Sequence, residues 1–311
     1  MDIGGTKIAL AVVGKEGTVL DAERIPTGAG RPALEVVDDI VACVHSRWAG
    51  RLPISRPVGV GVAGQVDPEG IVVLGPHLDW HDVPLRARLA RALGRPVSVL
   101  NDVQAATFGE WRFGAGRGVD DLVCLFLGTG VGGGIVAGGE LRHGATGTAG
   151  EFGHLTVVRD GRKCHCPNSG CLDAYVGGWA IAERAREAVS RDPLRGERLV
   201  AMAGNAAAIT SETVVSAYRA GDGLARSLVE ETMSYLVEGL VSIVNGINPR
   251  TVVLGGGVVH GFASLLPSIG RQVRARALPA AAAGLRIVPA SLGADSGVIG
   301  AAAFAQEALR G

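Results

Sequence analysis

The sequence predicts an α/β fold of two domains, each built around a mixed β-sheet that is covered by helices. Three apolar segments have the character of strands, and each runs into a glycine-rich loop. Segments with apolar residues at helical spacing fill the intervals between them. The first two strand segments share one strand–turn–strand pattern, which indicates an internal duplication. A chain of 311 residues is long enough for two domains with substantial cores.

The predicted strands all end where glycines begin. They comprise residues 2–7 with 8–13, residues 122–127 with 128–136, and residues 251–254 with 255–257. Met1 stands directly before residues 2–7, which read as the end of a strand whose first half is missing. Either translation begins late or the sequence is trimmed, and both explanations stay open.

Three helices are predicted with definable limits. The first contains an apolar face at helical spacing, formed by Val36, Val37, Ile40, Val41 and Val44. A longer helix begins at Asp222 as N-cap and stops at Asn248, directly before a proline. The last is the Ala-rich segment 297–309. The Gly/Arg-rich stretch 113–118 predicts a smaller domain over 1–115 and a larger one over 116–296, with helix 297–311 packing back on the first.

Composition excludes several classes of function. The 30 Lys and Arg balance the 30 Asp and Glu, so nothing favours electrostatic capture of nucleic acid or of an anionic membrane. The apolar runs are too short to span a bilayer, and no signal peptide is visible at the N-terminus. Five cysteines, of which three are clustered, predict reduced thiols and a metal. We therefore expect a cytoplasmic protein with no membrane or nucleic-acid partner.

The cysteine cluster has the spacing of a zinc site. His154 precedes Cys164, Cys166 and Cys171, and the alternative of three buried cysteines with an unrelated histidine is disfavoured by this spacing. Imidazole and thiolate groups are ligands that Zn²⁺ prefers, and four of them close its coordination sphere. The predicted zinc is therefore structural, and it would fix the loop that also carries Glu151 and Asp173.

The glycine loops are candidate phosphate-binding loops. Glycine lets several backbone N–H groups approach one anion. Neither residues 2–7 nor residues 128–134 match a Walker A loop or a dinucleotide fingerprint. The alternative for either loop alone is an ordinary hairpin turn. Together with Gly255, Gly256 and Gly257, the two loops favour a site that grips nucleotide phosphates.

Asp102 is the candidate general base. It follows the apolar run 97–100 and Asn101, and it precedes a helix start. A carboxylate at a strand end can take a proton from a substrate hydroxyl, which typically contributes ~10²–10⁴-fold to rate. The alternative is that Asp102 only caps the helix. His77 lies in a loop that either lines a polar pocket or sits on the surface, and His45, His81, His143 and His260 are interpreted as structural or exposed.

Together these residues resemble the ROK family of sugar kinases, repressors and open reading frames. The resemblance covers essentially the whole chain and is carried by the following segments: residues 2–7, 59–70, 101–102, 127–134, 150–154, the cysteine cluster and 248–257. It implies an actin-like, hexokinase-like (ribonuclease H-like) fold with a duplicated mixed-sheet core and an interdomain cleft. It also implies a homodimer or homotetramer.

The resemblance further implies a role for each matching residue. Asp102 would deprotonate the sugar 6-hydroxyl for attack on the γ-phosphate of ATP. The substrate-binding residues would be Gly64, Gln65, His77, Asn101, Asp102, Glu151, His154 and Asp173. ATP with Mg²⁺ would be held by Asp2, Gly4, Gly5, Thr6, Lys7, Gly128, Thr129, Gly130, Gly132, Gly133, Gly255, Gly256 and Gly257. His154 would place one ring nitrogen on zinc and the other toward the sugar.

Departures from the family pattern bear on the identity of the sugar. Asp173 stands where family members usually have glutamate, and His77 stands where glucokinase-like members often have asparagine. Pro167 replaces the glycine after the second cysteine. The expected function is ATP-dependent phosphorylation of a hexose, with glucose favoured. The alternatives are an amino- or N-acylhexosamine kinase, acting on N-acetylmannosamine or a 3-amino-3-deoxyglucose type of sugar, and a sugar-responsive repressor. Whether polyphosphate replaces ATP stays open.

Overall fold

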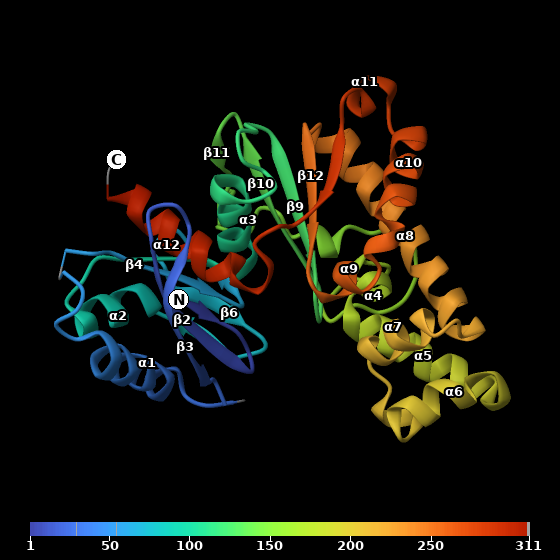
Figure 1. Ribbon diagram of the computed structural model, residues 1–311, viewed down its shortest axis with the longest axis horizontal. Coiled ribbons are helices and arrows are strands. Elements are labelled where there is room, and N and C mark those ends of the chain that lie inside the picture. Colours follow the sequence, from blue (N-terminus) through green and yellow to red (C-terminus); the bar gives the residue numbers. More distant parts are fainter. Residues whose placement is uncertain (29, 54, 310–311) are drawn as a thin grey trace. The chain divides into compact units, whose positions relative to one another are not determined.

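The structure is a computed structural model that describes residues 1–28, 30–53 and 55–309. It divides into two compact units (Figure 1). The first comprises Met1–Asp120, Gly134–Gly150 and the C-terminal segment from Ser291, and the second comprises Asp121–Gly133 and Glu151–Ala290. The sequence predicts one boundary at 115/116, whereas residues 116–120 and 134–150 group with the first unit. Part of this second segment is bonded there, as in Gly139 N–H to the Asp120 carbonyl at 2.9 Å, although residues 134–137 belong to a strand that pairs with residues 122–127 of the second unit.

The two five-stranded sheets have the same strand order, which confirms the predicted duplication and the mixed sheets. The first is β3-β2-β1-β4-β8, and the second is β11-β10-β9-β12-β13. Their strands are β1 Asp2–Ile3, β2 Lys7–Val13, β3 Val19–Pro26, β4 Val58–Val62, β8 Val97–Asn101, β9 Leu122–Leu127, β10 Val131–Ala137, β11 Glu140–Leu141, β12 Thr251–Gly255 and β13 Arg286–Pro289. In the first sheet β1 is antiparallel to β2 and parallel to β4. β12 is likewise parallel to β9 and β13.

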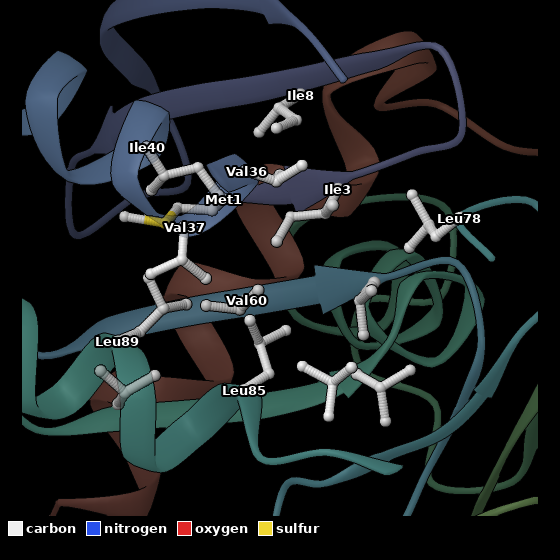
Figure 2. Packing of buried hydrophobic residues seen from close by; sticks show 14 of the residues in the cluster. Met1, Ile3, Ile8, Val36, Val37, Ile40, Val60, Leu78, Leu85 and Leu89 are labelled. Carbon is white, nitrogen blue, oxygen red and sulfur yellow. The ribbon is translucent and has the colours of Figure 1, made fainter. Parts of the chain in front are cut away.

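The core of the first unit lies between its sheet and two helices. α1 (Ala33–Trp48) and α2 (Leu85–Leu93) bury Val36, Ile40 and Leu89 against Ile3 and Val60 of the sheet (Figure 2). The apolar spacing predicted for α1 is therefore the face that packs on the sheet. A small sheet of β5 (Gln65–Val66), β6 (Val72–Gly75) and β7 (Trp80–Val83) follows β4 in the chain.

The opposite side of the same sheet holds α3 (Asp102–Phe113) and α12 (Ser296–Ala308). β4 has valines at alternate positions, which face the core, and the glycines between them face these two helices. A methyl group on Gly59 would overlap the Ala301 carbonyl, and one on Gly300 would overlap the carbonyl of Ala105. The absence of side chains therefore lets α12 contact both β4 and α3 at backbone distance.

A buried carboxylate fixes the segment that leads into α12. Glu110 of α3 is fully buried, and its oxygens accept the backbone N–H groups of Ala115 (2.9 Å), Ser291 (2.9 Å) and Leu292 (2.8 Å). A charged acceptor makes stronger hydrogen bonds than a neutral one. Glu110 therefore joins the C-terminal segment to α3.

The second unit is rich in helices, and many of them pack against one another. Its helices are α4 Asp173–Val176, α5 Gly178–Arg191, α6 Pro193–Ala203, α7 Ser211–Arg219, α8 Gly223–Ile247, α9 Gly257–Gly261, α10 Leu266–Arg276 and α11 Pro279–Ala282. α8 has the predicted limits: the Asp222 side chain caps its N-terminus, and Asn248 ends it in the left-handed region at φ 55°. Among the described helices, none carries a long enough apolar stretch to cross a bilayer.

A groove of about 290 Å³ continues the line of β1 in the first sheet. It is apolar where Leu10, Val12, Val58 and Trp48 line it. The Met1 amine lies at its end and donates to the Gly59 carbonyl at 2.7 Å. Burial lowers the pKa of this amine to about 6. Because the charged form is disfavoured in the folded state, the amine costs stability below pH 8, and this cost grows as the pH falls toward 6.

The close approach of α12 predicts the effect of one added methyl group. Gly300→Ala is expected to lower the free energy of unfolding by about 2 kcal/mol or more, since the backbones of α3 and α12 must separate. Gly246→Ala, on an exposed position of α8 with no atom within 4 Å of the added methyl, is the control and should be neutral or stabilising by up to ~1 kcal/mol. Equal urea unfolding midpoints for the two variants would contradict the close packing.

The groove predicts that a longer β1 stabilises the protein. Asp2 pairs with Ala9, so three residues joined ahead of Met1 would lie opposite Ala11, Val12 and Val13 if the register continued. Three β-branched residues there should raise Tm by a few degrees, and more at pH 6 than at pH 9, because the buried amine is replaced by an amide. A Gly-Ser-Gly extension is the control. An equal gain from both extensions would show that the groove does not select a strand.

Candidate active site and metal centre

The first unit places two carboxylates next to β4, one in β1 and one directly after β8. Asp2 lies in β1 opposite Gly61 of β4, and Asp102 begins α3 after β8. A side chain at Gly61 would contact Asp102 Cα at 3.3 Å and Asp2 Oδ1 at 3.7 Å, so both residues flank this glycine. Burial raises the pKa of Asp2, against the opposing effects of the Met1 amine and Lys7.

Asn101 caps α3, which answers the alternative raised for Asp102. The Asn101 side-chain oxygen accepts the N–H groups of Val103 (2.9 Å) and Gln104 (3.1 Å), and its amide donates to the Gly64 carbonyl at 3.0 Å. Asp102 stands in the first turn, where its Oδ1 accepts the Val103 N–H at 2.9 Å. Asn101 is therefore the N-cap of α3, and Asp102 is the first residue of the helix. Asn101 also links the loop at Gly64 to the start of α3.

Gln104 is buried and structurally important, although no pattern in the sequence indicates it. It is 3% exposed, and its amide donates to the carbonyls of Gly147 (2.9 Å) and Ala149 (3.2 Å). Its oxygen lies 2.9 Å from Nδ1 of His143, whose pKa is lowered by burial. Gln104 thus fixes the segment that leads directly to Glu151, and the partly buried His143 lies beside it.

The carbonyl groups of the loop at residues 4–7 accept hydrogen bonds that hold the loop in place. Gly4 N–H donates to the Lys7 carbonyl at 3.1 Å, and Thr27 donates through its hydroxyl to Gly4 at 2.6 Å and through its N–H to Thr6 at 3.1 Å. His77 lies against this loop, since a side chain at Gly5 would meet its Cβ and carbonyl oxygen at 3.0 Å. His77 and Gln65 are both exposed.

The second unit gathers the predicted zinc ligands. The ligand atoms of His154, Cys164, Cys166 and Cys171 all lie within 4.8 Å of one another. Cys166 Sγ is 3.6 Å from Cys171 Sγ, and Cys164 Sγ is 3.7 Å from His154 Nδ1. Zinc–sulfur bonds of about 2.3 Å in a tetrahedron separate the sulfurs by about 3.8 Å. The four groups therefore fit one Zn²⁺, with Nδ1 as the histidine ligand.

The electrostatics of the cluster favour a cation. Burial and the neighbouring thiols Cys166 and Cys164 raise the pKa of Cys171 to about 12, and burial raises that of Cys164. Thiolates this close repel one another unless a cation lies between them. Binding Zn²⁺ would therefore release protons from the cluster.

Glu151 lies beside the other nitrogen of His154. The two side chains approach to 3.9 Å between Glu151 Oε2 and His154 Nε2. Burial raises the pKa of Glu151, while His154 lowers it and Asp173 raises it. With Nδ1 directed at the metal cluster, His154 presents Nε2 on the side of Glu151.

The glycine loop at residues 128–131 is fastened to the start of α5. Gly178 N–H donates to the Gly128 carbonyl and Trp179 N–H to that of Thr129, both at 3.0 Å. Asp173 is 6% exposed: its Oδ1 accepts the Val131 N–H at 2.7 Å, and its Oδ2 accepts the indole N–H of Trp179 at 2.8 Å. Both carboxylate oxygens of Asp173 thus already have partners within the second unit.

A cavity of about 760 Å³ opens beside this loop, and all its lining residues belong to the second unit. Gly128 and Thr129 line it together with Gly257. Gly255 lies in β12, and Gly256 follows it at φ 90°, where a side chain would overlap the Leu127 carbonyl. The charged residues in the wall are Arg186 and Arg219 together with Glu183 and Glu212. Two of the three predicted glycine loops therefore border one cavity.

Comparison with known proteins places these residues in context. The model of the ROK family matches residues 1–308. A glucokinase from Streptomyces coelicolor is 34% identical over 99% of this chain and 96% of its own. The crystal structure of a ROK family glucokinase from Streptomyces griseus with glucose and AMPPNP matches with a TM-score of 0.84 and 36% identity, covering 98% of both chains. An N-acetylmannosamine kinase from Escherichia coli is 29% identical over 98% of this chain and 97% of its own.

Removing one thiol tests the metal centre. Cys166→Ser is expected to lose bound zinc, because a hydroxyl is a poor replacement for a thiolate, and to lower Tm. Cys124→Ser, which changes a buried thiol of β9 outside the cluster, controls for the loss of a cysteine. Metal content by mass spectrometry is the measurement. A full zinc equivalent in Cys166→Ser would remove this residue from the ligand set.

Proposed function

The chain belongs to the ROK family, and on that premise we propose that it transfers the γ-phosphoryl group of ATP to the 6-hydroxyl of a hexose, with glucose as the favoured sugar. The observation that carries this proposal is the cavity of the second unit, bordered by two glycine loops and by arginines. The similarity to glucokinases over the full chain agrees with it.

The cavity suits a nucleotide for three physical reasons. The N–H groups of Gly178 and Trp179 donate hydrogen bonds to the carbonyls of Gly128 and Thr129. These bonds orient the glycine loop with both carbonyls toward α5. The N-terminus of this 14-residue helix carries a partial positive charge beside the loop. Arg186 and Arg219 lie in the wall and would contact the phosphates, while Glu183 and Glu212 in the same wall balance their charge. Together these groups would hold the phosphates of ATP.

Asp102 would be the general base for the sugar hydroxyl. Asn101 caps α3, and this fixes the backbone of Asp102 at a defined position. Phosphoryl transfer needs positioning, charge neutralisation and a base, and little further chemistry from the protein. Asn101, Glu151 and His154 would hydrogen-bond the ring hydroxyls, and Gly64, Gln65 and His77 would also bind the sugar.

Two metal ions would assist. Mg²⁺, bound through the phosphates, would neutralise charge on the transferring group, and Asp2 would be one of the residues that hold it. Zn²⁺ on His154, Cys164, Cys166 and Cys171 would be structural, since four protein ligands complete its coordination. It would orient His154, so that Nε2 is available for a sugar hydroxyl.

Asp173 favours one second candidate, an N-acylhexosamine kinase. Both of its oxygens accept hydrogen bonds from Val131 and Trp179, so a sugar contact would have to share one of them. A weaker contact at this position relaxes the requirement for the hydroxyl pattern of glucose. The similarity to an N-acetylmannosamine kinase agrees with this alternative.

ADP release from ATP–Mg²⁺ is the decisive assay. Glucose, mannose, N-acetylglucosamine, N-acetylmannosamine and 3-amino-3-deoxyglucose form the panel, and we expect the largest kcat/KM with glucose. Asp102→Asn should retain sugar binding and lose about 10²–10⁴-fold in kcat. Asp38→Asn, an exposed change on α1, is the control. Preference for N-acetylmannosamine would select the second candidate, and near-normal turnover of Asp102→Asn would remove Asp102 as the base.

A further inference from the structure

We propose that the zinc loop of this chain also builds the nucleotide cavity: two of its residues, His165 and Asp173, hold Trp179, which in turn fixes the glycine loop at residues 128–131. This inference rests on the proposed function, since it concerns how the ATP site is positioned. Zinc would then influence the affinity for the nucleotide as well as the position of His154, the residue proposed to bind the sugar.

His165 provides the first contact. It stands between the ligands Cys164 and Cys166, and its ring stacks on Trp179 with centroids 4.1 Å apart and planes inclined by 33°. Both rings line the 760 Å³ cavity with Gly128 and Thr129. Aromatic pairs at this separation attract one another beyond their burial. One face of the indole is therefore held by the first half of the zinc loop.

Asp173 provides the second contact, from the other end of the zinc loop. It follows the ligand Cys171 by two residues and begins α4. Its Oδ2 accepts the indole N–H of Trp179 at 2.8 Å, while its Oδ1 accepts the backbone N–H of Val131 at 2.7 Å. The same carboxylate thus holds the edge of the indole and one residue of the β9–β10 turn.

The backbone of Trp179 completes the connection to the glycine loop. Its N–H donates to the Thr129 carbonyl at 3.0 Å, next to the bond from Gly178 to Gly128. Trp179 is therefore held in three ways: His165 stacks on the indole ring, Asp173 accepts the indole N–H, and the Thr129 carbonyl accepts the backbone N–H. His165 and Asp173 stand next to ligands that one zinc ion would hold together. Loss of the metal would let them move apart and release the glycine loop.

His165 is therefore a positioning residue for ATP, and three variants test it. His165→Ala removes the stack, His165→Phe keeps an aromatic ring there, and Trp179→Phe keeps the ring pair but removes the indole donor to Asp173. His81→Ala, an exposed histidine in β7, is the matched control. The measurements are Kd for AMPPNP and Kd for glucose by calorimetry, with the zinc content of each protein.

The expected result separates nucleotide from sugar. His165→Ala should weaken AMPPNP binding about two- to tenfold, the size of one lost aromatic pair, and leave glucose affinity and zinc content unchanged. His165→Phe should restore the wild-type Kd. Trp179 is the one tryptophan of the second unit, the others being Trp48, Trp80 and Trp111. Chelation of zinc should therefore change the emission of the wild type and leave that of Trp179→Phe nearly constant.

Other outcomes would overturn the inference in distinguishable ways. If the wild type binds AMPPNP and His165→Ala binds it equally well, the stack has no positioning role and the proposed function stands. If His165→Ala weakens AMPPNP and glucose alike while losing zinc, the variant has only disrupted the metal loop, and the specific role of His165 is wrong. If the wild type binds no AMPPNP, the proposed function fails and the inference fails with it.

Discussion

The backbone contact of α12 with α3 and β4 is the constraint on which the first unit depends. Gly59 and Gly300 permit it, and Glu110 secures it by accepting three backbone N–H groups from the segments around it. The same helix α3 carries Asp102 at its first position. The candidate base thus lies on a helix that Asn101 caps at its N-terminus and that packs closely against α12. Such packing limits the freedom of a catalytic group, because dense cores resist small displacements.

The second unit uses a different device for the same purpose. Two of the four residues of its glycine loop have no side chain with which to pack, and hydrogen bonds with Gly178, Trp179 and Asp173 set the position of the loop. These partners adjoin the metal cluster in sequence. A loop that must present its backbone to a ligand cannot stabilise itself, and neighbouring polar groups compensate for this. The rigidity that α12 supplies in one unit would come from a metal ion in the other.

Features of the fold and the site that depend on residues close together in the sequence could be predicted from the sequence alone. The limits of α8 follow from Asp222 and Asn248, and the metal ligands follow from four residues within eighteen positions. The identical strand order of the two sheets agrees with the duplication visible in their glycine turns. Gln104, Glu110 and the contacts of Asp173 could not be found in this way. Each of them has at least one partner more than 40 residues away along the chain, as in Val131 to Asp173 and Glu110 to Ser291. Neither a glutamine nor a glutamate within a helix differs in pattern from an exposed one. Residues whose importance comes from burial of a polar group are recognisable only after folding brings their partners together.

The division of the chain between the units has a consequence for its biosynthesis. The backbone crosses from one unit to the other four times, and the first unit takes its last helix from residues 296–308. Until that segment leaves the ribosome, the glycine face of β4 and the carboxylate of Glu110 lack the partners that cover them in the native state. The second unit, whose long segment 151–290 emerges earlier, can order before the first is complete. Completion of the first unit therefore waits for the C-terminal helix, and contacts of such large sequence separation form slowly.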